Sequence, residues 1–421
     1  MRRFTLVAVS LALLASCDAG TTSDKASYSA RDSAGIEIVE SRTPIWDDHT
    51  RWRLGEQPTL EIGAGIAGDS VREFGYISGV HSLSGGTVAV VDAWAPSVMF
   101  FDAAGGLLGR IGRRGTGPGE FPPRRESVRN SFVCGGDTVF VVVSRSIAAY
   151  VSPGAHIRTM APRPWARTRT CAGNRLIGEL WHTRTHTSPG IYRDSLLLAW
   201  YDLDGKQQAV IDSLPAEERA WSRGTAHEGM GYSLQLFGRV LSLAGRDGVF
   251  ATGFGETFQV ELRDAKGITR IMRVAGRERN VSAADVQRFR DYVFNPWRGN
   301  DDERRNLENR LASAIGGPRP AFAELRFDQA GNLWVREYDH TDAVAFYDYS
   351  TFSPNSARPT LTEVRRWVVL DMNGRYLGEV TMPRTFDVHE IGEDWVLGVW
   401  RDELDIQYVR KYPLIKSKRL K

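Results

Sequence analysis

The chain has 421 residues, of which 54 are Lys or Arg and 51 are Asp or Glu, so its formal net charge is only +3. No dense basic block precedes the short C-terminal run Lys416–Lys421, and this balance excludes a typical nucleic-acid-binding protein. Aromatic residues make up 10% of the chain and 42 residues are glycine, a composition typical of all-β proteins with many turns.

The first residues predict export. A basic start, Met1–Arg3, is followed by an apolar run, Phe4–Ala15, that is too short to anchor a folded protein across a bilayer. The quartet Leu14-Ala-Ser-Cys17 resembles the lipobox of bacterial lipoproteins. The resemblance implies that residues 1–16 are a cleaved signal peptide and that Cys17 carries lipid, palmitate included. We therefore expect a chain anchored in the cell envelope, facing the periplasm or the cell exterior, with the choice of membrane left open.

Residues 17–34 are polar and rich in Ser, Thr, Asp and Ala, which is typical of a flexible tether. The remaining residues, 35–421, exceed the size at which one simple core keeps growing. A repeat architecture is the expected solution.

Two glycine-rich stretches resemble phosphate-binding loops, and neither fits. Gly63-x-Gly65-x-x-Gly68 matches the dinucleotide fingerprint, but no helical pattern follows it. Gly115–Gly119 is followed by no Lys-Ser/Thr pair and by no switch from strand to helix. We expect both to be loops, and we expect no cofactor.

A repeated unit dominates the rest of the chain. Each copy has a turn, usually with Gly, an apolar strand, a second strand of alternating pattern, and in most copies an Asp-x-x-Gly turn before a last strand. The glycines of the later turns, at positions 105, 154, 205, 267 and 374, are 49, 51, 62 and 107 residues apart, and every interval except the last matches one four-stranded propeller blade. Six copies follow the turns at Gly85, Gly136, Asn174, Gly248, Gly331 and Glu393.

Residues 282–317 interrupt the repeat between the fourth and fifth copies. They lack alternation, and Ser282 with Asp285 is typical of a helix N-terminus. The sequence therefore predicts an all-β fold, a six-bladed β-propeller with a helical insertion. Since the sixth copy lacks its last strand, we expect an N-terminal strand, Ile36–Glu40, to complete it and close the ring.

The segment Gly112–Phe121, the Asp-x-x-Gly turns and Ala330–Glu337 together resemble the NHL-like six-bladed propeller proteins of bacterial cell envelopes. The resemblance covers nearly all of the mature chain. It implies the fold and leaves the activity open, because such folds host many functions.

One residue per copy, seven positions before the first apolar residue of the second strand, is expected on each innermost strand. Four of these six residues suit an anionic ligand in the central channel. Alternatively, polar side chains there hydrogen-bond neighbouring blades or channel water. The ligand-binding candidates are His81, Arg169, Arg326 and His389, and the other two positions are Phe132 and Ser242.

Cys134 and Cys171 take equivalent positions in consecutive copies. A disulfide would persist in an exported chain. Two buried thiols are the alternative, because a bond needs Cα atoms within about 7 Å, and neighbouring blades can hold equivalent positions slightly farther apart.

Together these features predict a lipid-anchored envelope protein that binds a ligand or protein partner through a propeller face or its channel. The alternative is a metal-dependent hydrolase or lyase of the lactonase type at the channel mouth. It is disfavoured, because no Asp/Asn/Glu set repeats at the inner positions and the ring supplies only two imidazoles. Glu324, Asp387 and Glu390 lie near inner strands and keep it open. We expect no metal and favour a role without catalysis.

Overall fold

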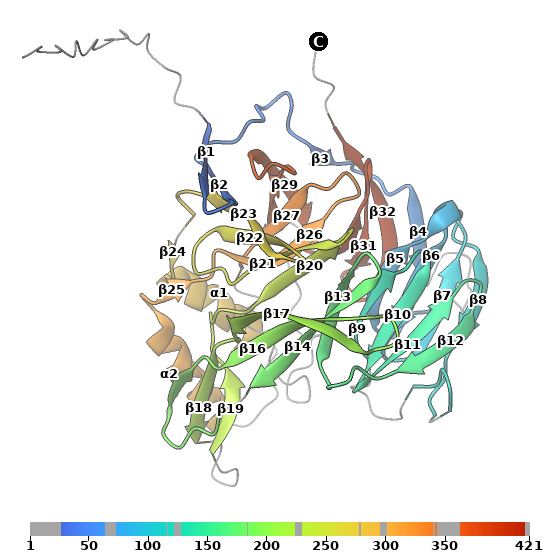
Figure 1. Ribbon diagram of the computed structural model, residues 1–421, viewed down its shortest axis with the longest axis horizontal. Coiled ribbons are helices and arrows are strands. Elements are labelled where there is room, and N and C mark those ends of the chain that lie inside the picture. The colour runs from blue at the N-terminus through green and yellow to red at the C-terminus, as the bar shows by residue number, and fades with distance from the viewer. Residues whose placement is uncertain are drawn as a thin grey trace, which may run out of the picture.

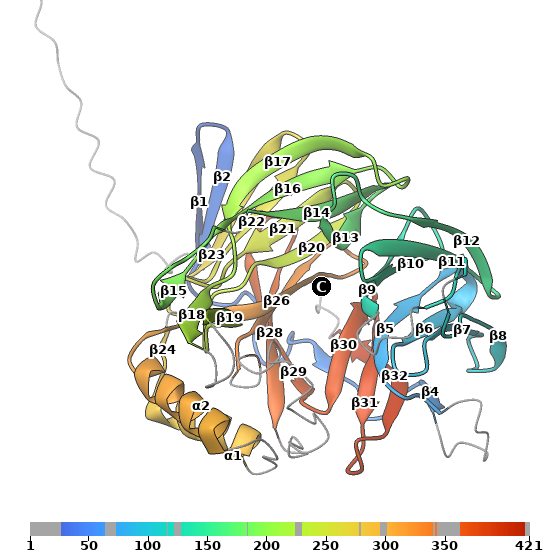
Figure 2. The same cartoon turned by 90° about the horizontal axis from the view of Figure 1, so that it is seen from below.

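Six small sheets stand around a common centre in the computed structural model (Figures 1 and 2). The predicted six-bladed propeller is confirmed. The structure describes residues 27–63, 73–115, 117–121, 128–182, 184–223, 230–277, 279–294, 301–339, 342 and 363–416. No helix among these residues is long and apolar enough to cross a membrane.

Each blade contains four antiparallel strands that follow one another outward from the centre. The strands are β5 (Ile77–Ser82), β6 (Val88–Asp92), β7 (Ser97–Phe101) and β8 (Leu107–Ile111) in blade 1; β9 (Val128–Cys134), β10 (Thr138–Val143), β11 (Ser146–Val151) and β12 (Ala155–Met160) in blade 2; β13 (Arg167–Ala172), β14 (Arg175–His182), β16 (Ser195–Tyr201) and β17 (Gln207–Pro215) in blade 3; β20 (Ser242–Arg246), β21 (Val249–Gly253), β22 (Gln259–Asp264) and β23 (Gly267–Val274) in blade 4; β26 (Phe322–Phe327), β27 (Leu333–Glu337), β28 (Val364–Leu370) and β29 (Tyr376–Pro383) in blade 5; and β30 (Phe386–Ile391), β31 (Trp395–Arg401), β32 (Gln407–Ile415) and β4 (Leu60–Gly63) in blade 6.

The core is divided among the seams between blades, with one apolar cluster at each of the six seams. Middle strands are therefore covered on both faces, and every residue of β6 and β7 is buried. No residue of the outer strand β8 is buried. This pattern explains why the middle strands are continuous apolar runs in the sequence.

The Asp-x-x-Gly turns connect third to fourth strands. In blade 1, the carboxylate of Asp102 accepts the N–H groups of Ala104 at 2.9 Å and Gly106 at 2.7 Å. Gly105 has a φ of 84°, a region that favours glycine. The aspartate thus replaces the backbone partners that the turn lacks.

The predicted closing strand is wrong in position. Strand β4, not Ile36–Glu40, pairs with β32 and completes blade 6, with Ile62 opposite Val409. Leu60 and Ile62 are buried at the seam between blades 6 and 1. The short run Leu60–Gly63 offers few residues for a sequence pattern, whereas residues 36–40 form the more conspicuous strand.

Residues 36–40 belong to β2 (Ile36–Ser41), which pairs in parallel with β23 on the outside of blade 4. Strand β1 (Tyr28–Ser33) pairs with β2, so part of the range predicted as tether is a strand. The crossing segment, residues 42–52, then passes along blade 5, where the N–H of Trp46 donates to the carbonyl of Leu377 at 2.7 Å. Strand β3 (Arg53–Leu54) reaches β32. The N-terminal segment therefore covers the edges of three consecutive blades.

All six innermost strands start at the same face of the ring, called here the loop face. It receives the connections between blades and the turns between second and third strands. The predicted helical insertion lies there, as α1 (Ala283–Phe294) and α2 (Asp301–Ala314) between β24 (Arg279–Asn280) and β25 (Pro318–Arg319). A small sheet of β15 (Gly190–Tyr192), β18 (Arg219–Arg223) and β19 (Met230–Leu234) accompanies it.

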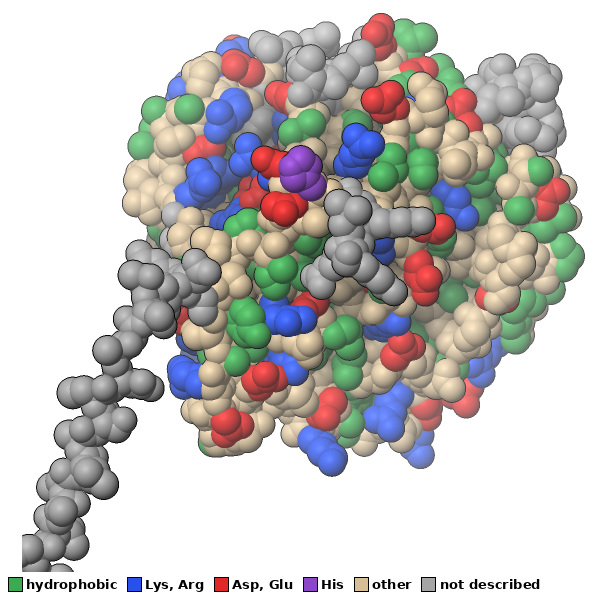
Figure 3. All heavy atoms as spheres, turned by 90° about the horizontal axis from the view of Figure 1, so that it is seen from above, with side chains coloured by type: hydrophobic (Ala, Val, Ile, Leu, Met, Phe, Trp, Pro, Cys, Tyr) green, Lys and Arg blue, Asp and Glu red, His purple; other side chains and the backbone are tan. Residues whose placement is uncertain are grey.

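The helices lie beside the ring and do not cover its centre (Figures 1 and 2). Ser282 caps α1, since its hydroxyl accepts the N–H of Asp285 at 3.1 Å and its own N–H donates to the Asp285 carboxylate at 2.9 Å. Phe289 packs with Phe237 and Tyr338, which ties the insertion to the loops of neighbouring blades. On the opposite face, charged side chains of both signs are scattered among hydrophobic ones (Figure 3).

Candidate functional site

The centre of the ring is accessible to solvent. Side chains on the innermost strands would be hidden if the centre were filled, yet Asp387 exposes 39%, Arg326 30% and Glu390 28% of their side-chain surface. We call this space the lumen. Its polar lining makes it the candidate ligand site.

Three of the predicted residues meet in the lumen. His389 accepts the N–H of Val80 through Nδ1 at 3.3 Å, and its carbonyl accepts a hydrogen bond from Arg326. His81 Nε2 lies 2.9 Å from the hydroxyl of Ser131 on β9. His81, Arg326 and His389 therefore form one cluster across blades 1, 5 and 6.

These polar side chains also hold the blades together. An innermost strand has one edge without a neighbouring strand, and side chains from the adjacent blade satisfy it. Along β5, the N–H groups of Ile77, Val80 and Ser82 donate to Gln407 at 2.6 Å, to His389 at 3.3 Å and to Glu390 at 2.8 Å.

The same arrangement recurs at other seams. Asn130 donates to the carbonyl of Arg169 at 2.6 Å, and the hydroxyl of Ser242 donates to the carbonyl of Ala323 at 2.9 Å. The sequence left two interpretations of the inner polar residues, a ligand site or hydrogen bonds between blades. Hydrogen bonds between blades account for Ser242 and for much of the surroundings of His389.

Burial sets the protonation of the lumen cluster. It lowers the pKa of His81 to about 3, with His389 and Arg326 adding to the effect, and it lowers the pKa of His389 to about 4, reinforced by Arg326. Burial also raises the pKa of Glu390 to about 7, against the Ser82 N–H and the charges of Arg326 and Lys411. Both histidines are neutral at neutral pH, so the cluster's fixed cation is Arg326.

A second group of charges lies toward the loop face. Burial raises the pKa of Asp387, but Arg365 and Arg401 outweigh it and hold this pKa at about 2. Arg336 lies 2.9 Å from Glu324 and 2.7 Å from Asp342. Of the three acids that kept an enzymatic role open in the sequence, Glu324 and Asp387 are thus paired with arginines, whereas Glu390 accepts the N–H of Ser82.

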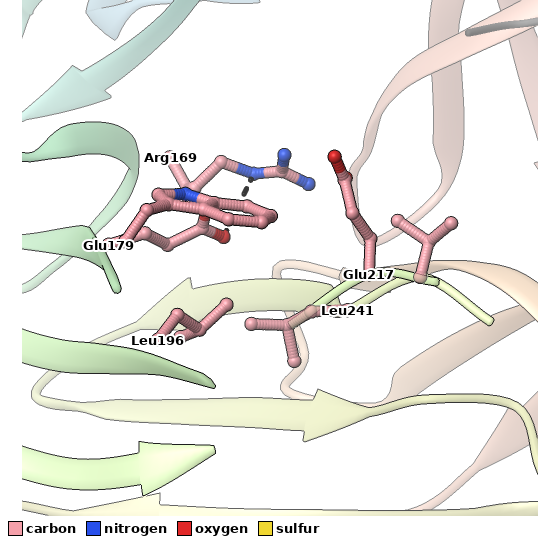
Figure 4. Close-up of a pocket in the computed structure, with 7 residues that line it drawn as sticks. Arg169, Glu179, Leu196, Glu217 and Leu241 are labelled. Atoms are coloured by element: carbon pink, nitrogen blue, oxygen red, sulfur yellow. Dashed lines mark hydrogen bonds and ion pairs between the residues drawn. The ribbon is translucent and has the colours of Figure 1, made fainter. Parts of the chain in front are cut away.

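Arg169 does not join the other three candidates. It lies on blade 3, where its Nε is 3.7 Å from the Glu179 carboxylate, at a shallow recess of the loop face (Figure 4). Glu217 faces the guanidinium across this recess in the same view. The recess is lined by Arg169, Glu179, Trp181, Leu196, Glu217, Val240 and Leu241.

Unequal hairpins explain this misplacement. The expected ring assumed one spacing in every blade, but Val88 pairs with Ser82, six positions earlier, whereas Leu176 pairs with Cys171 and Val249 with Arg246. Phe132 keeps the spacing of His81. Bulges at Arg169 and His389 shift the register again. Turn length and bulge position leave little trace in a single sequence.

Cys134 and Cys171 form a disulfide in the structure, with Cα atoms 5.9 Å apart. The bond joins the innermost strands of blades 2 and 3. Of the two alternatives left open by the sequence, the structure adopts the bonded one.

Among the residues that the structure describes, no three or more His, Cys, Asp or Glu side chains gather in a way that could hold a metal ion. The lactonase-type alternative therefore gains no support from these residues. Cys17, the predicted lipidation site, lies outside the described residues.

Comparisons with known proteins assign the chain to no family. No protein-family model and no curated protein matches the chain, so membership of the NHL-like lipoprotein group stays a prediction. Among solved structures, an exported protein from Bacteroides fragilis aligns with 10% identity and a TM-score of 0.45, over 90% of this chain and 99% of that one. A DUF4221 member from Bacteroides vulgatus gives 10% identity and a TM-score of 0.48, over 87% and 99%. A streptogramin B lyase gives 9% and 0.37, over 88% and 100%.

Proposed function

We propose that this protein is a lipid-anchored envelope protein that binds a ligand or protein partner at the loop face of its propeller, where the lumen opens. The observation that carries the proposal is the solvent-accessible, charged lumen lining. Asp387, near the loop-face end of β30, exposes 39% of its side chain. A scaffold without a ligand would have no need to keep such charges accessible at the centre of a ring.

The insertions add to this argument. The helices α1 and α2 and the sheet β15-β18-β19 all extend the loop face, whereas the opposite face has only short turns between strands. Loops on a rigid scaffold are the usual carriers of binding residues. The proposal therefore assigns recognition to the loop face.

Photo-cross-linking in native envelopes tests this assignment. A photoreactive residue replaces Trp94, in the loop-face turn between β6 and β7, or Met372, in the turn between β28 and β29 on the opposite face. The two positions are a matched pair, 51% and 50% exposed. Adducts at position 94 that are absent at position 372 are expected. Adducts at position 372 alone, or none at either position, would overturn the proposal.

A further inference from the structure

Arg167 is a cation that forms no ion pair with the described residues. It lies at the loop-face end of β13, partly buried, opposite Glu179 in the register of β14. Its guanidinium makes no hydrogen bond and no ion pair within 4 Å to the described part of the chain. A guanidinium has five N–H donors, and leaving all of them without an acceptor among the described residues at a partly buried position is costly.

The surroundings of Arg167 are rich in positive charge. Arg169 follows on the same strand, and Arg129 is exposed on the neighbouring innermost strand β9. The side chain of Asn130 bonds the carbonyl of Arg169 at 2.6 Å, which fixes β9 beside β13. The two strands are also joined by the disulfide.

The nearby acids are already engaged. Glu217 accepts two hydrogen bonds from Arg219, at 3.2 and 2.9 Å. Glu179 accepts from the indole of Trp181 at 3.3 Å and lies 3.7 Å from Arg169. Among the described residues around Arg167, four guanidinium groups thus outnumber two carboxylates, and the excess charge is positive; the groups are those of Arg129, Arg167, Arg169 and Arg219 against Glu179 and Glu217.

The lowered pKa of Arg167 agrees with an excess of positive charge around it. Burial lowers its pKa, Arg169 and Arg129 lower the pKa further, and Glu179 and Glu217 oppose them incompletely. The protein therefore stabilises the Arg167 cation less well than water does. A bound anion would supply the missing charge.

We propose that Arg167, Arg169 and Arg129 form a binding site for an oxyanion, a phosphate or carboxylate group, at the loop-face end of blades 2 and 3. The inference rests on the proposed ligand-binding role and names the chemistry that the ligand presents. Guanidinium groups bind such anions through paired, charge-assisted hydrogen bonds. The recess beside Arg169, with Trp181 and Leu241, offers apolar surface to the rest of the ligand (Figure 4).

Titration calorimetry on the full chain in detergent tests the site, with inorganic phosphate and citrate as two separate probes. The wild type is expected to bind at least one of them, and Arg167→Gln to bind it about tenfold or more weakly. The matched control is Arg110→Gln, which removes an exposed arginine of β8. Preference for phosphate or for citrate identifies the class of anion.

Thermal unfolding provides a second readout with a distinctive sign. Without anion, Arg167→Gln is expected to unfold at a higher temperature than the wild type, because it removes an unpaired cation. A structural role for Arg167 predicts the opposite. The probe should raise the unfolding temperature of the wild type and leave that of Arg167→Gln almost unchanged.

No binding of either probe by the wild type, equal weakening by Arg110→Gln, or unimpaired binding by Arg167→Gln would overturn the site. These outcomes are separate from the cross-linking experiment. Adducts at position 94 with no anion binding would defeat the oxyanion site alone, whereas anion binding without adducts would defeat the partner-binding assignment and leave the site in place.

Discussion

His389 shows how one side chain in the lumen serves the fold. Its Nδ1 accepts the Val80 N–H, so the neutral ring carries its hydrogen on Nε2. Protonation at Nδ1 would remove the acceptor that His389 offers to the Val80 N–H. A neutral His389 is therefore a condition for this contact between blades 6 and 1.

Stability should depend on pH through three lumen groups with opposite signs. His81 and His389 have folded-state pKa values near 3 and 4, so the unfolded chain binds more protons than the folded one as pH falls below about 6.5, and stability is lost. Glu390, with a pKa of about 7, holds a proton that the unfolded chain releases above about 4.5, so its contribution is lost as pH rises. Between about pH 4.5 and 6.5, the opposite effects of the histidines and of Glu390 on the pH dependence of stability partly cancel.

Glu390→Gln removes one of the opposing contributions and keeps an acceptor for the Ser82 N–H. We expect its free energy of unfolding to rise more steeply than that of the wild type between pH 5 and 7. The difference is at most about 1.4 kcal/mol per pH unit, and smaller because 28% of the carboxylate side chain is accessible. Urea unfolding at several pH values measures it.

The control is Glu393→Gln, at an exposed position of the turn between β30 and β31, which should leave the slope unchanged. Identical slopes in the wild type and Glu390→Gln would contradict the raised pKa of Glu390.

The sequence predicted polar residues on the innermost strands, and His81, Arg326 and His389 do meet. The sequence did not predict Arg167 as a binding residue, because the absence of an ion pair with the described residues is visible only in the structure. The positions of Glu179 and Glu217 relative to Arg167 depend on β13, β14 and the connection after β17, which no local spacing encodes.

At the scale of elements, the blades followed from composition and turn chemistry, while the closure did not. Alternation and Asp-x-x-Gly turns are local signals. Pairing β4 with β32 joins residues more than 340 positions apart, and β2 offers a more conspicuous strand pattern than β4. Only the packing of Leu60 and Ile62 between blades 6 and 1 selects the closing strand.

The disulfide makes a covalent link between two such elements. It closes a loop of 37 residues, so Cys134→Ser should lower the free energy of unfolding by about 4 kcal/mol in the chain-entropy model. Denaturant unfolding with and without reductant measures this loss, and reduced wild type should match the variant. Two free thiols in the unfolded wild type, labelled without reductant, would show that the bond is absent.

At the scale of the whole molecule, a lipid on Cys17 would determine where the propeller acts. If Cys17 carries lipid, the ten residues from Asp18 to Ser27 separate it from β1 and reach at most about 35 Å. Cys17→Ser should therefore lose labelled palmitate and move from the membrane fraction to the soluble fraction. Cys134→Ser is the control and should stay with the membrane. Unchanged membrane association of Cys17→Ser would contradict the anchor.

The separation of β1 and β2 from the closing strand has a mechanical consequence. If Cys17 is anchored, a pull from the membrane would act on β1, an exposed strand at the edge of the blade 4 sheet that pairs with β2. The β1–β2 hairpin would separate first. The force would then have to detach the crossing segment, in which the ring centroids of Trp46 and Trp52 lie 4.6 Å apart. The pairing of β4 with β32, which closes the ring, would be loaded last. A force from the membrane could therefore act on the N-terminal end of β1 while the propeller ring stays closed.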